Sequence, residues 1–141
     1  MKTRADTLSV SALARGAGVG VPTIRYYERR GLLPVPRRRP SGYREYTADA
    51  IRRVRFIRHA QQLGFSLAEV NELLSLRIEP GHSCADVRAR AQRKIADIAT
   101  RVDDLNRMRR TLERLVEACP GDAPVRACPI LDALEDEHGD R

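Results

Sequence analysis

The sequence predicts a mainly α-helical protein: a small N-terminal helix-turn-helix unit with a β-wing, then one long helix, then a short C-terminal helix. Three observations support this fold class. Glycine and proline interrupt residues 1–83 repeatedly, whereas residues 84–118 contain neither and read as one unbroken amphipathic helix. The 141 residues include four Tyr, two Phe and no Trp, too few aromatic side chains for a large single core. The many Ala, Leu, Arg and Glu residues suit extended helical packing.

Two short helices joined by a glycine-containing turn are predicted near the N-terminus. Ser9 can cap a helix over residues 10–15, which Gly16 and Gly18 are expected to break. Pro22 suits the first turn of a second helix, which Gly31 stops. This layout is that of a helix-turn-helix. The second helix offers side chains suited to base edges and phosphates, namely Thr23, Arg25, Tyr26 and Arg29.

A β-wing is predicted after the second helix, because proline and glycine exclude a helix from residues 34–42. Short extended pieces around a Ser41-Gly42 turn would form a small hairpin with a basic tip that can follow a phosphate backbone. The alternative is a solvated run of charge. An arginine triplet on a hairpin directly after a helix-turn-helix favours binding. The tip residues are Arg37, Arg38, Arg39, Tyr43 and Arg44.

Two further helices complete the N-terminal part. Thr47 is expected to cap a helix over residues 48–63. Ser66 and Glu69 form a capping box that opens a connecting helix over residues 67–76. This helix and the following hinge join the two parts of the chain, so we expect them to relay a signal between them.

A Glu-Pro-Gly-His hinge at 79–82 places the first domain boundary after residue 79, so residues 1–79 form the winged helix-turn-helix domain. Residues 80–119 form a long dimerisation helix capped by Ser83. Its seam residues alternate steps of seven, four and three, which is typical of a coiled coil. The seam consists of Cys84, Ala91, Ile95, Ile98, Val102, Leu105, Arg109, Leu112, Val116 and Cys119.

The three cysteines predict a metal site shared between two chains. Cys84 and Cys119 are 35 residues apart, so the helix rise would separate their thiols by roughly 52 Å within one chain. If two copies of the helix lie antiparallel, Cys84 of one chain lies beside Cys119 of the other. Cys128 can reach the same place across a short loop, so residues 120–141 are interpreted as a metal-binding loop and short helix. Two-fold symmetry then gives two equivalent sites in each dimer.

Three thiolates favour a soft ion that accepts low coordination, whereas closed zinc sites take four ligands. His82 could supply a fourth ligand, although a hinge histidine in solvent is the simpler interpretation. The alternative for the cysteines is that all three are incidental small hydrophobic residues. The spacing argues against that alternative: two thiols lie on one seam, five heptads apart, and the third follows across a tight loop.

Charge and composition bound the function. Residues 1–60 carry 14 Lys and Arg against 4 Asp and Glu, and residues 61–141 carry 12 against 15. A basic N-terminal half predicts a nucleic-acid-binding unit. We expect neither a signal peptide nor a membrane span, and three cysteines fit a reducing cytoplasm better than a disulfide scaffold. A thiol enzyme that processes metals is the competing class, but no nucleotide loop, flavin motif or C-x-x-C pair supports it. A regulator with an organic effector is a third possibility, disfavoured by the short segment after Cys119.

The chain resembles the MerR family of transcriptional regulators over nearly its whole length. The resemblance rests on the segments TIRYYERRGLL (23–33), GYREY (42–46) and LGFSLAEV (63–70). Cys84, Cys119 and the Cys-Pro-Ile-Leu segment at 128–131 resemble the mercury-responsive branch, in which three matching cysteines bind Hg(II) across the dimer interface. The resemblance implies a homodimer that controls a mercury-resistance operon and is not an enzyme.

The resemblance also implies how such a regulator acts. The apo protein represses a promoter whose polymerase elements are spaced too far apart. Metal binding then distorts the DNA so that RNA polymerase can start transcription. Arg25 and Tyr26 match recognition-helix contacts, and Tyr43 and Arg44 match wing contacts.

A lead- or cadmium-responsive regulator of a metal efflux operon is the alternative within the family. Those branches share much of the cysteine pattern. They often carry an extra cysteine where this chain has Gly18, and they lack the Leu-Gly-Phe-Ser-Leu stretch. The zinc branch adds more Cys and His ligands near the loop, and the copper(I) branch relies on the loop pair alone. This chain follows neither, so the resemblance favours mercury.

Overall fold

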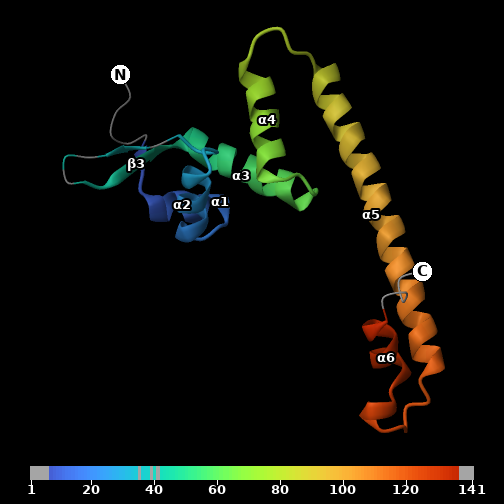
Figure 1. The fold of residues 1–141 in the computed structure, drawn as a ribbon. Helices are drawn as coiled ribbons and strands as arrows, with labels where there is room; N and C mark the ends of the chain where they lie inside the picture. The colour runs from blue at the N-terminus through green and yellow to red at the C-terminus, as the bar shows by residue number, and fades with distance from the viewer. Residues whose placement is uncertain (1–6, 35, 39, 41, 137–141) are drawn as a thin grey trace. The chain divides into compact units, whose positions relative to one another are not determined.

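The computed structural model describes residues 7–34, 36–38, 40 and 42–136, and it is mainly α-helical, as predicted (Figure 1). The chain divides into two compact units, Met1–Lys94 and Ile95–Arg141. The first unit extends past the boundary predicted at residue 79 and includes the start of the long helix. No helix in the described ranges is both long and apolar enough to cross a membrane.

The first two helices of unit 1 form the predicted helix-turn-helix. Helix α1 spans Val10–Ala17, and the Ser9 side chain accepts a hydrogen bond from the Ala12 backbone N–H at its start. The break predicted at Gly16 was wrong, because α1 continues through this residue for one further position. Gly18 ends α1 in the left-handed conformation, with φ of 73°, which glycine adopts without steric cost. Helix α2 spans Val21–Arg29 and has proline in its first turn.

The predicted wing is present beside α2. Strands β2 (Arg37–Arg38) and β3 (Arg44–Thr47) pair antiparallel, with Arg37 opposite Glu45 and Arg38 opposite Arg44. A third strand, β1 (Thr7–Leu8), pairs with the other edge of β3. The sequence analysis missed β1 because two residues are too few to show strand alternation.

Helices α3 (Ala48–Gln62) and α4 (Leu67–Ile78) pack against each other and enclose the core with α1 and α2. Thr47 occupies the N-cap position of α3, but its side chain makes no capping hydrogen bond, so the predicted cap is positional only. The capping box of α4 is present in full: the Ser66 hydroxyl and the Glu69 carboxylate each accept the other residue's backbone N–H. The buried apolar residues are Leu13, Ala14, Ala17, Ile24, Tyr27, Leu32, Leu33, Tyr46, Val54, Ile57, Ala60, Val70 and Leu74.

Helix α5 is the predicted long helix and runs without interruption over Cys84–Ala118. Ser83 accepts a hydrogen bond from the Ala85 N–H, and the Asp86 carboxylate accepts one from the Ser83 N–H. Within unit 2, a short turn of 3-10 helix (η2, Val125–Ala127) leads into α6 (Pro129–Glu135), which lies alongside the C-terminal half of α5 (Figure 1).

Candidate nucleic-acid interface and metal centre

Helix α2 divides into a buried face and an outer face. Ile24 and Tyr27, three residues apart, are buried in the core. The Tyr27 hydroxyl donates to the Gln61 side-chain oxygen at 2.7 Å, and burial raises the pKa of this phenol, so it remains a neutral donor. The predicted DNA-contacting residues lie outside this core face: Thr23 is half-buried, and Arg25, Tyr26 and Arg29 are exposed.

A carboxylate joins α2 to the wing. Glu28 accepts hydrogen bonds from the Arg44 guanidinium and from the Tyr46 hydroxyl, both on β3. The Glu28 side chain is only 9% exposed. Burial and the bond to Glu28 raise the pKa of Tyr46, so Tyr46 stays a donor. Helix α2 and strand β3 of the wing are therefore joined by two hydrogen bonds to one carboxylate.

Sequence reasoning missed Glu28. The available signal was that Glu28 is the only acidic residue between Asp6 and Glu45, in a segment rich in arginine. A single carboxylate among many cations is well placed to pair with one of them. The pairing partner, Arg44, was predicted as a DNA contact, and the structure shows that Glu28 also fixes where its guanidinium lies.

A groove brings together residues from α1, α2 and the wing. It has a volume of about 540 Å³. Arg25, Tyr43 and Arg44, which the sequence assigned to two separate elements, line it together. Ser9 and Ser11 at the start of α1 line it as well, and sequence reasoning gave neither a role at the interface. Guanidinium groups and hydroxyls in one concave surface suit a phosphate backbone.

The wing carries its predicted residues on a two-stranded ribbon. Tyr43 is 73% exposed, and Arg38 is also exposed. Arg37 occupies the β2 position opposite Glu45. Arg39 and Ser41, which the sequence placed at the tip, lie outside the described residues.

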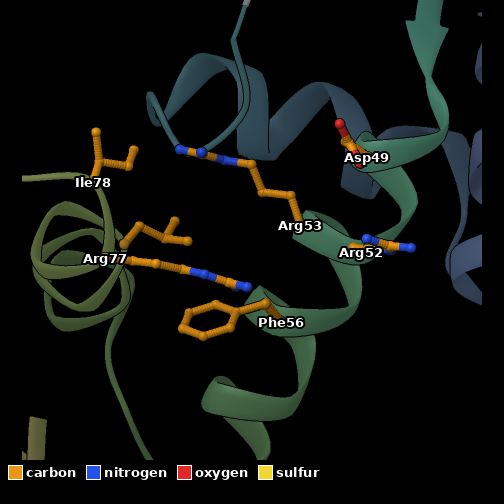
Figure 2. A pocket seen from close by; sticks show the side chains of 7 residues that line it. Asp49, Arg52, Arg53, Phe56, Arg77 and Ile78 are labelled. Carbon is orange, nitrogen blue, oxygen red and sulfur yellow. The ribbon is translucent and has the colours of Figure 1, made fainter. Parts of the chain in front are cut away.

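Several arginines of α3 bind the protein itself. The Arg53 Nε donates to the Leu32 carbonyl at 2.6 Å, and Arg55 donates to the Gly16 carbonyl at 2.8 Å. Figure 2 shows the Arg77 side chain of α4 beside the ring of Phe56, and Arg53 of α3 nearby; the three residues help to line a hollow of about 260 Å³. Part of the positive charge of the first 60 residues therefore holds the helices and connecting turns in place.

The three cysteines are free thiols and lie in different units. Cys84 is the first residue of α5, in unit 1, and is exposed. Cys119 directly follows α5, and Cys128 caps the start of α6, both half-buried in unit 2. Among the described residues, no three His, Cys, Asp or Glu side chains of one chain gather where they could hold a metal ion.

His82 is engaged by acidic neighbours. Its Nε2 lies 3.1 Å from the Glu79 carboxylate, and its Nδ1 lies 3.3 Å from that of Asp86. The bonds to Glu79 and then to Asp86 raise the pKa of His82. Because a metal ligand needs a free, unprotonated ring nitrogen, this geometry argues against His82 as a fourth ligand.

The seam of α5 is exposed over most of its length. Leu105 is 62% exposed. Thr111 and Leu115, four residues apart in the C-terminal half of α5, are half-buried and do not belong to the seam, and α6 lies alongside this half of the helix. The exposed apolar seam residues are Ile95, Ile98, Val102, Leu105, Leu112 and Val116.

Comparison with known proteins identifies two matching family descriptions. "MerR HTH family regulatory protein" matches residues 8–76, and "MerR, DNA binding" matches residues 51–115. The transcriptional regulator ZntR of Escherichia coli K12 is 42% identical over 128 residues, which cover 89% of this chain and 91% of that protein. A mercuric resistance operon regulatory protein of Serratia marcescens is 39% identical over 137 residues, covering 97% and 94%.

A solved structure supports the same relationship. The regulator PbrR691 of Ralstonia metallidurans CH34, solved in complex with lead(II), has a TM-score of 0.79 and 33% identity. The match covers 90% of this chain and 98% of that one. Similar proteins are thus named for different metals.

Proposed function

Because the chain belongs to the MerR family of helix-turn-helix regulatory proteins, we propose that it is a cytoplasmic, Hg(II)-responsive regulator of a mercury-resistance operon. At the coarser level, it is a metal-responsive, DNA-binding transcriptional regulator and not an enzyme. The three free thiols, Cys84, Cys119 and Cys128, carry the choice of a soft metal ion. Gly18 and the Leu-Gly-Phe-Ser-Leu stretch at 63–67 favour Hg(II) over Pb(II) or Cd(II).

The exposed seam of α5 supports a homodimer. An apolar stripe at coiled-coil spacing along a 35-residue helix is unstable in water unless it is covered. A second copy supplies the complementary stripe. In the antiparallel arrangement, Cys84 of one chain lies beside Cys119 and Cys128 of the other. The two ends of the dimer are then equivalent and each carries one complete thiol set.

The donor chemistry fits a soft cation. Thiolates are soft ligands, and three of them satisfy an ion that accepts low coordination, as Hg(II) does. Both ring nitrogens of His82 contact carboxylates, so the nearest histidine offers no fourth ligand. Binding would join the start of α5 in one chain to the end of α5 in the other. The bound ion would therefore be attached to α5, whose first residues belong to the DNA-binding unit.

At the promoter, we propose that α2 enters the major groove and the wing follows the adjacent phosphates. The contacts come from Thr23, Arg25, Tyr26, Arg29, Arg37, Arg38, Tyr43 and Arg44. The apo dimer represses, and the Hg(II)-bound dimer distorts the DNA so that RNA polymerase can engage both promoter elements. Few base contacts and many phosphate contacts suit a protein that acts through DNA shape.

A regulator of Pb(II) or Cd(II) efflux is the second candidate, and the similarity to PbrR691 favours it. A titration of the purified dimer under thiol competition separates the two. The Hg(II) proposal predicts that Hg(II) binds at two equivalents per dimer and more tightly than Cd(II), Pb(II) or Zn(II). A higher affinity for Pb(II), with Pb(II)-induced transcription, would select the alternative.

The shared site is tested by mixing variants. Chains carrying Cys84→Ser or Cys119→Ser alone should lose Hg(II)-induced transcription while keeping DNA binding. A heterodimer of the two regains one intact site, because one chain keeps Cys84 and the other keeps Cys119. An equimolar mixture that recovers no metal binding would contradict the cross-chain arrangement.

A further inference from the structure

Lys94 on α5 is the only buried charged residue in the part of the chain that the structure describes, at 6% exposed. Its Nζ donates to the Glu69 carboxylate at 2.8 Å and lies 5.4 Å from the centre of the Phe65 ring. Its side chain also passes over Gly64, with the Cδ 3.8 Å from the point where a Cβ would stand. Lys94 therefore lies against the turn between α3 and α4.

The Glu69 carboxylate accepts a second hydrogen bond besides the one from Lys94. The same Glu69 oxygen that accepts from Lys94 also accepts the Ser66 backbone N–H at 2.9 Å, as half of the α4 capping box. The hydrogen bond from Lys94 is the largest cause that lowers the pKa of Glu69, to about 2. The carboxylate is therefore ionised throughout the physiological range. It links the first residue of the α4 cap to a residue of α5.

Burial makes this link difficult to break. An ammonium group taken out of water needs a partner of opposite charge, and losing that partner is strongly unfavourable. If α5 shifts, the start of α4 must follow, or Lys94 must reach water. The Arg90–Glu72 ion pair, one turn earlier on α5, is a weaker link, because its side chains are 31% and 54% exposed, against 8% for Lys94 and 35% for Glu69.

We propose that Lys94 is the positioning residue that transmits movement of α5 to the DNA-binding unit, through Glu69 at the start of α4. The sequence analysis placed the signal path in the helix at 67–76 and the hinge that follows it. The proposed relay uses the start of that helix and bypasses the hinge. Lys94 is also the last residue of unit 1, so the link lies where α5 leaves that unit. The inference rests on the proposed function only in taking Hg(II) binding as the event that moves α5. The mechanical link itself can be measured without metal.

The test compares four variants of the full chain. Lys94→Met removes the ammonium and keeps an unbranched apolar side chain. Glu69→Gln keeps an oxygen for the Ser66 N–H and removes the ion pair. Two controls keep the Lys94 link: Ser66→Ala weakens the α4 cap, and Arg90→Ala removes the exposed ion pair. Circular dichroism establishes whether each variant is folded. If Lys94→Met does not fold, the result for Glu69→Gln alone decides whether the ion pair couples α5 to the DNA-binding unit.

The metal-free measurement is hydrogen exchange in residues 95–105 of α5, with and without a duplex selected for tight binding to the wild-type protein. Coupling is reciprocal, so DNA that fixes unit 1 should slow exchange along α5, by about fivefold or more in the wild type. Lys94→Met and Glu69→Gln should lose this effect, and both controls should keep it. An unresponsive wild type, or a full response in both ion-pair variants, would overturn the proposal.

The metal measurement separates this proposal from the proposed function. Hg(II)-induced transcription by the wild type tests the function alone. If the wild type responds, the two ion-pair variants should bind Hg(II) with affinity within about threefold of wild type and lose most of the induction. If the wild type does not respond to Hg(II), the function fails, and the exchange result still decides whether Lys94 couples α5 to the DNA-binding unit.

Discussion

Replacing Glu28 by glutamine should weaken DNA binding through a residue that need not touch DNA. Glu28 accepts hydrogen bonds from both Arg44 and Tyr46. A glutamine side chain offers one acceptor oxygen and a donor NH₂, so one of these two donors loses its acceptor. The neutral amide also removes the negative charge that pairs with Arg44, so the Arg44 guanidinium is held less firmly at its place beside Arg25 and Tyr43 in the groove.

The expected size follows from burial. The Glu28 side chain is 9% exposed and the Tyr46 residue is 4% exposed, so the loss of one bond costs about 1–3 kcal/mol of unfolding free energy. A cost of that size lowers the melting temperature of a unit this large by about 4–8 °C for each kcal/mol. If Arg44 contacts a phosphate, its misplacement reduces the magnitude of the slope of the logarithm of the DNA-binding constant against the logarithm of salt concentration by about 0.9.

The assay is a fluorescence titration of duplex DNA at a series of salt concentrations, at a temperature where every variant is folded. Arg44→Met defines the full loss of one contact. Arg110→Met, which removes an exposed arginine of α5, controls for the change in net charge. We expect Glu28→Gln and Arg44→Met to lose similar slope, and Arg110→Met to change it little. A Glu28→Gln protein that is destabilised yet binds DNA with wild-type slope and affinity would refute the positioning role.

Three further predictions follow from the same structure. The pKa of Glu69 is lowered from 4.5 to about 2, so its contribution to stability is present above its ordinary pKa and lost as the pH falls. Acid unfolding should therefore cost the wild type more stability than Glu69→Gln between about pH 5 and pH 2; parallel curves would contradict this. An added Cβ at Gly16 would stand 2.8 Å from the Ile51 Cδ1, so Gly16→Ala should gain less than the roughly 1 kcal/mol of helix propensity that alanine has over glycine. The same substitution made beside Ile51→Val, which lacks that atom, should gain more of it in thermal melts, and an equal gain in both backgrounds would contradict this. Leu105→Lys should convert the dimer to a folded monomer in sedimentation, because Leu105 is 62% exposed in the single chain; a dimer that survives would place the interface elsewhere.

The helices could be predicted from the sequence because their boundaries are set by local chemistry. The Ser66–Glu69 capping box and the left-handed Gly18 both act within a few residues of the helix end. The same is true of the long α5, where the absence of glycine and proline was sufficient. Strand β1 was not predictable in this way, because its two residues gain their conformation only by pairing with β3.

The groove shows where local reasoning ends. Arg25, Tyr43 and Arg44 could be nominated from residue type, and the structure brings them together. The role of Glu28 depends on contacts between residues 16 and 18 positions apart, which no local pattern shows. Lys94 is a further example, because an exposed coiled-coil lysine and a buried one look alike in sequence. In the folded chain it lies beside Gly64, Phe65 and Glu69, which are about 25–30 residues away in sequence.

Net charge misleads in a related way. The excess of arginine in the first 60 residues predicted a nucleic-acid partner, and membership of a DNA-binding family supports that prediction. Yet Arg53 and Arg55 donate to backbone carbonyls, and Arg44 pairs with Glu28. An arginine that satisfies a carbonyl at the end of a helix contributes to the long-range field, which steers DNA toward the surface. It contributes less to the count of phosphates neutralised on contact. The DNA-binding constant should therefore depend less steeply on salt concentration than the number of arginines in unit 1 suggests, because several of them form hydrogen bonds within the protein.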